Sequence, residues 1–143
     1  MTRATPTIDE TAHHDLACLM ERVCVAPFAE YRWKTRRLRR LWVDAEGIVD
    51  AMAGPMSAIE SGDCRYMYRD LARFPGVRDP DGVELYLRGW YSRLRSIVED
   101  VRPRSVLERE DCAYLLETLA LLDEAISLAV RIERRRFAGD SPR

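Results

Sequence analysis

Residues 112–132 read CAYLLETLALLDEAISLAVRI, and this stretch decides the fold. Its apolar residues recur in alternating steps of three and four, the spacing that aligns side chains along one side of an α-helix. Two such seams are present. The first comprises Cys112, Leu115, Leu119, Leu122, Ile126 and Ala129. The second comprises Tyr114, Thr118, Leu121, Ala125, Leu128 and Ile132, in which the Thr118 hydroxyl can bond to the Tyr114 carbonyl.

Two seams on different sides of one helix cannot both face a single neighbour. The helix is therefore either enclosed within its own bundle or shared with a second copy of the chain. Each of the other long helices supplies its own apolar stripe, which leaves the second seam with only a short helix as internal cover. We therefore favour a homodimer, because burial of each large aliphatic side chain contributes about 1.5 to 3 kcal/mol. Its expected self-association residues are Tyr114, Leu121, Leu128 and Ile132.

Capping residues, prolines and glycines along the chain predict four long helices and one short helix. The long helices are expected over residues 7–24, 27–53, 80–101 and 105–136, and the short one over 63–73. Residues 55–62 read as a connector with room for one helical turn at Met56 to Glu60, and 74–82 read as a loop. Strand patterns are nearly absent, so we predict an all-α fold, an up-down type bundle. The domain is expected to span 7–136, between a disordered N-terminus (1–6) and a flexible C-terminal tail (137–143).

Several residues mark the ends of these helices. Thr7 with Glu10, and Ser105 with Glu108, have the spacing of capping boxes. Asp79 is positioned to cap the helix that begins at Pro80. Helix boundaries are also marked by Pro27, which suits a first helical turn, by Gly47, which permits a kink, and by Gly54-Pro55, which should end the second long helix.

The distribution of charge tests the topology. The second long helix begins basic and ends acidic, whereas the last helix begins acidic with Glu108, Glu110 and Asp111 and ends basic. In an up-down bundle these two helices run in the same direction. The early arginines should then lie level with the early acids, and part of the basic cluster should be neutralised within the chain.

Composition excludes several classes of protein. The chain has 143 residues, 47% of them hydrophobic and 33% charged, with a formal net charge of -1. A nearly neutral chain has no whole-molecule attraction to nucleic acid or to an anionic membrane. No segment approaches about 18 uninterrupted apolar residues, so none is expected to span a membrane. The four cysteines lack Cys-x-x-Cys spacing, and no secretory signal is visible, which favours a cytoplasmic protein with reduced thiols.

The candidate partner-binding residues are Trp33, Arg36, Arg37 and Arg40. On a continuous helix they point away from the apolar stripe, and Trp33 lies one turn from Arg36 and Arg37. A tryptophan among arginines is typical of a protein interface and also suits a platform for single-stranded nucleic acid. The alternative is that Trp33 packs inward and the arginines are solvated or paired with acids.

The residues that catalysis needs are sparse. Glu10 and His13 have the spacing of a helical metal-site fragment, but such sites need the fragment twice, and His13 and His14 are the only histidines. Both are expected on the surface. Cys18 lies within reach of them, yet no orienting acid is evident. We therefore expect no metal, no cofactor and no enzymatic activity.

These observations favour a helical bundle that acts by binding another protein, as an adaptor or regulator. Two alternatives remain open. One is a nucleic-acid-binding regulator that uses the arginines of the second helix. The other is a small-molecule sensor with a pocket between helices, lined by Trp42, Trp90 and the tyrosines near Tyr66.

Overall fold

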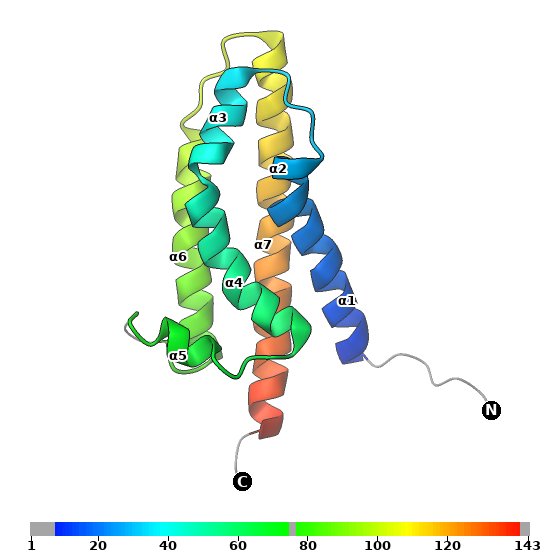
Figure 1. The fold of residues 1–143 in the computed structure, drawn as a ribbon, viewed down its shortest axis with the longest axis vertical. Coiled ribbons are helices and arrows are strands. Elements are labelled where there is room, and N and C mark those ends of the chain that lie inside the picture. The colour runs from blue at the N-terminus through cyan, green and yellow to red at the C-terminus, as the bar shows by residue number, and fades with distance from the viewer. Residues whose placement is uncertain (1–7, 75–76, 141–143) are drawn as a thin grey trace, which may run out of the picture.

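The computed structural model describes residues 8–74 and 77–140, and no strand occurs in these residues. The elements are α1 (Ile8–Met20), the π-helix η1 (Glu21–Val25), α2 (Ala26–Ala29), α3 (Arg36–Asp44), α4 (Glu46–Ser61), α5 (Met67–Leu71), α6 (Pro80–Glu99) and α7 (Val106–Asp140). The arm formed by α1, η1 and α2 runs upward, α3 and α4 run downward, α6 upward and α7 downward (Figure 1). The predicted all-α, up-down bundle is confirmed.

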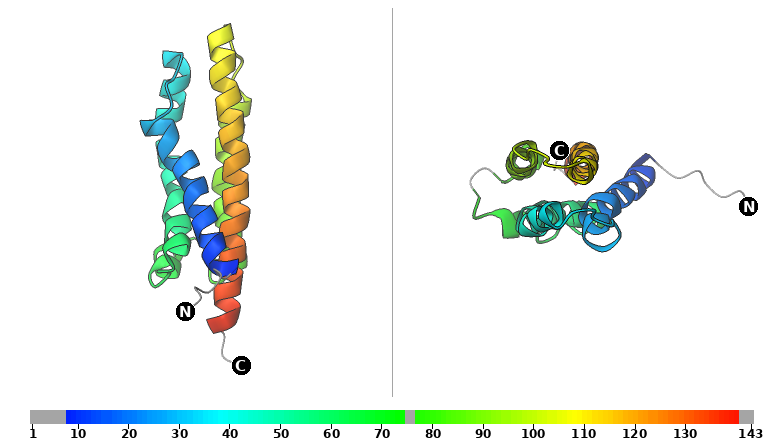
Figure 2. Two further views of the ribbon diagram at one scale, coloured as in Figure 1. Left: turned by 90° about the vertical axis from the view of Figure 1, so that its right-hand side faces the viewer. Right: turned by 90° about the horizontal axis from the view of Figure 1, so that it is seen from above.

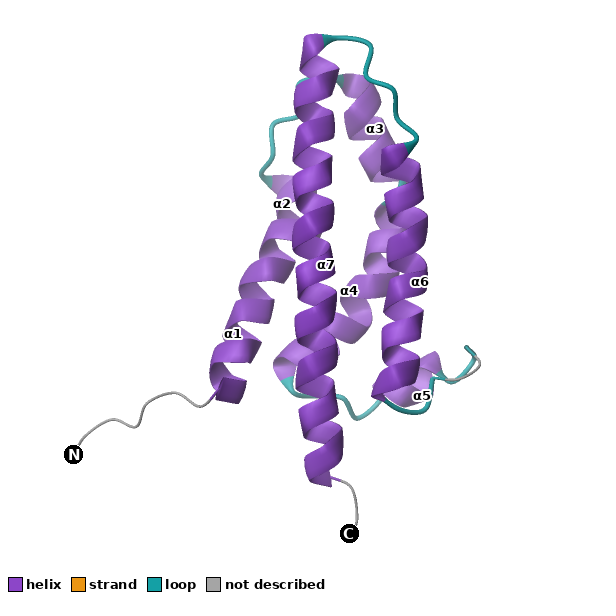
Figure 3. Cartoon of the chain, turned by 180° about the vertical axis from the view of Figure 1, so that it is seen from behind, coloured by secondary structure: helices purple, strands orange, loops and turns teal. Residues whose placement is uncertain are grey.

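Helix α7 is the centre of the bundle, since it contacts α1, η1, α3, α4 and α6. Seen from above, α6 and α7 form one layer, and α1 to α4 form the other (Figure 2). Figure 3 shows α6 and α7 side by side on the opposite face. The first seam of α7 is buried from Leu115 to Ala129, and the Thr118 hydroxyl donates to the Tyr114 carbonyl oxygen at 2.9 Å as predicted.

The expectation that the second seam lacks an internal cover is wrong. Leu128 is only 8% exposed, Ile132 is equally buried, and Leu121 is half-buried. Tyr114 stacks on Tyr31 with ring centroids 3.5 Å apart. Helix α1 supplies the missing cover, because it contacts both α4 and α7 and not one neighbour alone. The four residues assigned to a dimer surface therefore belong largely to the interior of one copy.

The second long helix is not continuous. Residues 27–53 are divided into α2, a non-helical segment at 30–35, α3 and part of α4. Pro27 does lie in the first turn of α2, but α2 extends the first arm rather than opening the second. Since proline lacks an N–H and its ring presses on the preceding turn, it interrupts the regular α-helical ladder, and the turn before it is π-helical.

Asp111 of α7 shapes the segment at 30–35. Its buried carboxylate accepts from the Tyr31 hydroxyl at 2.7 Å and the Lys34 N–H at 3.1 Å. It also accepts from the Thr35 N–H at 2.9 Å and the Thr35 hydroxyl at 2.8 Å. These bonds hold the chain out of helical geometry, with Thr35 extended at φ -131° and ψ 145°. They stabilise a break in the helix at residues 30–35 that the local sequence does not predict.

The boundaries of α3 and α4 also differ from the prediction. The helical axis breaks at Ala45, two residues before Gly47. Gly54-Pro55 does not end the helix, because α4 continues through Pro55 to Ser61, so the supposed connector at 55–62 is mostly helical. The helix ends instead at Gly62, whose φ of 79° is left-handed and favours glycine.

The predicted cap of α6 is confirmed, because the Gly82 N–H donates to Asp79 Oδ1 at 2.9 Å. Of the capping box of α7 one bond forms, from the Glu108 N–H to Ser105 Oγ at 3.1 Å, while Glu108 Oε1 accepts from the Arg104 N–H at 2.9 Å. Helix α7 ends at Asp140, so the tail expected at 137–143 begins later than predicted. The short helix α5 is confined to Met67–Leu71. Thr7, residues 1–6 and residues 141–143 lie outside the described part of the chain.

The predicted neutralisation between helices is confirmed. Arg37 Nη2 lies 2.6 Å from Glu108 Oε1, and its Nε donates to Glu108 Oε2 at 3.0 Å. Lys34 Nζ and Glu110 Oε2 are 3.7 Å apart. The start of α3 and the start of α7 therefore lie at the same level, as parallel second and fourth arms require.

Candidate functional site

The four expected partner-binding residues do not form one outward face. Trp33 lies in the non-helical segment, half-buried, and its Nε1 donates to the Pro27 carbonyl oxygen at 2.9 Å. Its ring meets those of Tyr31 and Tyr114 edge-on, at 4.8 and 5.9 Å between centroids. The helical wheel misplaced Trp33 because the residues before Arg36 are not helical. Trp33 joins the arm to α7.

Arg37 is also part of the internal framework. Besides binding both Glu108 oxygens, it donates to the Arg102 carbonyl oxygen at 2.9 Å. Its guanidinium group, together with the Arg104 N–H, lowers the pKa of Glu108 to about 2. Arg37 therefore ties α3 to the turn before α7, while Arg36 and Arg40 remain exposed.

The aromatic residues expected to line a sensor pocket are dispersed. Trp42 is fully buried, with its ring centroid 6.0 Å from that of Phe28. Tyr66 is exposed beneath the Arg69 guanidinium, whose Cζ is 4.3 Å from the ring centroid. Trp90 of α6 is half-buried and packs against the core. Trp90 and Tyr66 line two different cavities, and Trp42 lies in the core.

The histidines differ in their environments. His14 is exposed, as expected, with Nε2 3.7 Å from Cys18 Sγ. His13 is half-buried and donates from Nδ1 to the Glu60 carbonyl oxygen at 2.7 Å, so its expected surface position is wrong. Within residues 8–74 and 77–140, no group of three or more His, Cys, Asp or Glu side chains could hold a metal ion.

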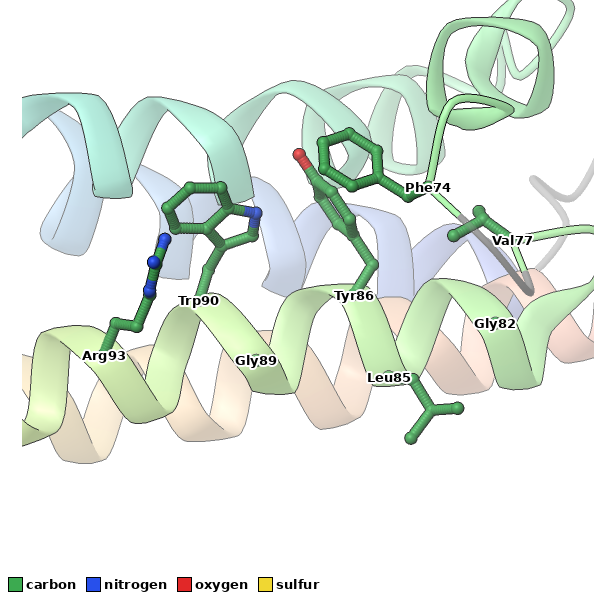
Figure 4. Close-up of a pocket in the computed structure, with 8 residues that line it drawn as sticks. All are labelled: Phe74, Val77, Gly82, Leu85, Tyr86, Gly89, Trp90 and Arg93. Carbon is green, nitrogen blue, oxygen red and sulfur yellow. The ribbon is translucent and has the colours of Figure 1, made fainter.

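A groove on α6 is the strongest candidate for a binding site. It has a volume of about 390 Å³ and lies between α6 and the residues Phe74 and Val77, which follow α5 in the chain. Its lining residues are Phe74, Val77, Gly82, Leu85, Tyr86, Gly89, Trp90 and Arg93. In Figure 4 three aromatic rings rise on one side of α6, Leu85 projects on the other, and the glycines lie along the helix between them.

The aromatic side of the groove is a packed wall. The rings of Phe74 and Tyr86 are 4.9 Å apart between centroids and inclined at 66°. Tyr86 and Trp90 follow at 6.4 Å and 71°. Edge-to-face packing of this kind holds the rings in place without a ligand. The groove thus offers a preformed apolar wall.

On the other side of α6, Leu85 and Gly89 are largely uncovered by the described chain. Leu85 is 74% exposed, the most exposed of the large apolar residues in the described chain. A Cβ atom built on Gly89 would meet nothing within 4 Å. Glycine inside an exposed helix costs about 1 kcal/mol relative to alanine, and packing within this chain does not require it at Gly89. Both features suit a surface that receives a side chain from outside.

The charge around the groove is positive. The Arg93 guanidinium lies over Trp90, with Cζ 4.9 Å from the ring centroid, and that of Arg73 lies 5.3 Å from Phe74. Arg134 of α7 pairs with both nearby acids, Asp81 and Glu84, at 2.7 and 2.9 Å, and offsets one of their two negative charges. These three arginines and two acids carry one net positive charge. A complementary partner would therefore combine apolar side chains with acidic ones.

This site was not predicted from the sequence, although the pattern of apolar residues and glycines in α6 indicates it. Val83, Leu87 and Leu94 form the buried stripe of α6. Leu85 lies off that stripe, with a glycine three residues before it and another four residues after it. An apolar residue between two glycines on the polar side of a helix indicates a second, uncovered flank. The uncovered apolar surface that the sequence predicted on α7 is therefore found on α6, at Leu85.

Comparison with known proteins adds no relative. No family model, curated protein or solved structure matches the chain. Among the described helices, none combines the length and the apolar character needed to cross a membrane.

Proposed function

We propose that the protein acts as an adaptor or regulator by binding another protein through the α6 groove. The observation that carries this proposal is the exposed Leu85 and the open position at Gly89 on α6, next to a preformed wall of three aromatic rings on the other side of the helix. A buried aromatic and aliphatic cluster is the usual energetic centre of a protein interface. The groove runs along a helix, a shape that suits an amphipathic helix of the partner.

The chemistry of the rim specifies the partner further. Arg93 and Arg73 flank the aromatic wall, and Arg134 pairs with both Asp81 and Glu84, so the rim has three arginines against two acids. The partner helix should therefore place large apolar residues three or four positions apart in the groove. It should also carry aspartate or glutamate beside them.

A displayed library of helical peptides with random surface residues tests this assignment. Immobilised protein should enrich acidic peptides with apolar residues at helical spacing. Synthetic copies of these peptides should bind Leu85→Asp at least about tenfold more weakly, because the carboxylate cannot be buried unpaired and repels the acidic helix. Gly89→Leu, which fills the groove, should have the same effect.

Leu116→Asp is the matched control, since Leu116 is an equally apolar residue of α7 that is 53% exposed and does not line the groove. It should bind the selected peptides like the unaltered protein. Equal binding by Leu85→Asp, or selection of peptides without acidic residues, would contradict the proposed site.

A second proposal is nucleic-acid binding at the upper end of the bundle. Exposed arginines gather there from α3 and the turn before α7, which lie at the same end (Figure 1). They are Arg36, Arg39, Arg40, Arg102 and Arg104. This proposal ranks second because Trp33, the expected stacking platform, is turned inward. It predicts affinity for labelled single-stranded DNA that falls steeply with salt and that Arg36→Ala with Arg40→Ala reduces.

A further inference from the structure

A second cavity lies at the lower end of the bundle, away from the α6 groove. It has a volume of about 270 Å³ and lies where α1, the turn after α4 and α7 meet. Its lining includes His13, Ile59, Cys64, Ile132, Glu133 and Arg136. Polar and apolar groups from three separate parts of the chain thus face one small space.

Glu133 is the unusual member of this set. It follows Ala129 by four residues, which places an acid on the apolar first seam of α7, and its side chain is 0% exposed. One oxygen, Oε1, accepts from Arg136 Nε. The other, Oε2, has no hydrogen-bond partner in the described structure. A buried carboxylate oxygen without a donor is costly, so this position calls for one.

The Tyr68 hydroxyl and the Cys64 thiol lie beside Glu133 and interact with it, but neither makes a well-formed hydrogen bond to Oε2 in the described structure. Burial, and then the charge of Glu133, raise the pKa of Tyr68 and raise the pKa of Cys64 to about 11. Both groups are therefore neutral near pH 7. The thiol is not a nucleophile there, and the cavity is suited to binding rather than to covalent chemistry.

The other polar groups define two ends. His13 donates from Nδ1 to the Glu60 carbonyl oxygen, so in the neutral ring Nε2 is the acceptor. His13 and Glu133 thus provide acceptors, while the Arg136 guanidinium provides donors and positive charge. Ile59 and Ile132 supply an apolar surface. Arg135 also lines the cavity. A cation alone would be repelled by the two arginines, and an anion alone by Glu133.

We propose that this cavity binds a free α-amino acid with an aliphatic side chain. Its ammonium group would donate to Glu133 Oε2, its carboxylate would accept from Arg136, and its side chain would pack on Ile59 and Ile132. A zwitterion adds no net charge, and its two charged groups can pair with Glu133 and Arg136 at the same time. This inference is independent of the α6 groove.

Calorimetry and thermal unfolding with L-leucine and L-valine test the proposal. Either amino acid should bind and raise the melting temperature, because a ligand that binds only the folded state stabilises it. N-acetyl-L-leucine, which lacks the ammonium group, and L-leucinamide, which lacks the carboxylate, should bind at least about tenfold more weakly. If neither amino acid binds at millimolar concentration, the cavity holds solvent and the proposal is wrong.

Two variants locate the binding. Glu133→Gln replaces the acceptor oxygen, and Cys64→Leu fills part of the cavity while both members of the Glu133–Arg136 pair remain in the chain. Each should raise the Kd for L-leucine at least about tenfold. Glu117→Gln, at an exposed acid of α7, should leave it unchanged. If Glu133→Gln does not fold, Cys64→Leu decides, and undiminished binding by that variant assigns the amino acid to another site and overturns the proposal.

Discussion

Two carboxylates at the start of α7 organise the upper end of the bundle at the residue scale. Asp111 fixes the segment at 30–35, and Glu108 binds Arg37 and the Arg104 N–H. Burial acts to raise the pKa of Asp111, but hydrogen bonds from Tyr31, Thr35 and the backbone outweigh it and the pKa is lowered. Each carboxylate is therefore stabilised in its charged form by folding.

Replacement of Asp111 by alanine should be severe. It leaves two hydroxyl groups and two backbone N–H groups without their acceptor, and we expect a loss of about 3 to 5 kcal/mol in the free energy of unfolding. Urea denaturation followed by circular dichroism measures this loss. Glu110→Ala, which removes only an exposed pair with Lys34, should cost less than about 1 kcal/mol. Similar losses in both variants would refute the anchoring role of Asp111.

Glu108 should make stability depend on acid. Its folded pKa of about 2 lies below the ordinary value of about 4.3. Its contribution is therefore complete above about pH 5 and is lost as the pH falls toward 2. Glu108→Gln should be less stable at pH 7 but should lose less stability between pH 5 and 2. Parallel melting-temperature profiles for the two proteins would show that Glu108 is not responsible.

At the scale of elements, the helices use their glycines in opposite ways. Gly62 ends α4 with a φ of 79°, a conformation that alanine resists. Gly89 lies inside α6 with open space where a Cβ would point. The first glycine is required by the backbone, whereas the second weakens an exposed helix and leaves a groove open.

Alanine substitutions distinguish these two uses. Gly89→Ala should stabilise the isolated protein by about 0.5 to 1 kcal/mol, because alanine favours the helix and nothing obstructs its methyl group. Gly47→Ala, at another exposed and open helical position, is the matched control and should also stabilise. Gly62→Ala should instead cost about 1 kcal/mol. Thermal unfolding of the three variants gives the signs, and destabilisation by Gly89→Ala would mean that this glycine has a packing role.

At the scale of the whole molecule, the burial of α7 removes the reason for a dimer through its second seam. Leu128→Ala should act as a core mutation and lower the free energy of unfolding by about 2 to 5 kcal/mol. The urea midpoint of the unaltered protein should be independent of its concentration, since folding does not need a partner copy to cover this seam. The interpretation would be wrong if the urea midpoint of the unaltered protein rose with protein concentration while that of Leu128→Ala did not.

The predictable parts of the fold are those specified by neighbouring residues. Asp79-Pro80 and Ser105–Glu108 mark helix starts that the structure reproduces. The break at 30–35 escaped prediction because its cause, Asp111, is distant in sequence. The inward direction of Trp33 was not predicted for the same reason, since Trp33 lies in this non-helical segment. The α6 groove escaped because its aromatic wall includes Phe74, whose position depends on how the segment after α5 folds back.

The dependence of the 30–35 segment on Asp111 has a consequence for biosynthesis. Tyr31 and its carboxylate acceptor are 80 residues apart, so the ribosome releases the first bend of the chain long before the group that fixes it. The nascent first half can form its helices but cannot hold the bend between them. Completion of the upper end therefore waits for the beginning of α7, and a chain arrested before that point should be a target for chaperones and proteases.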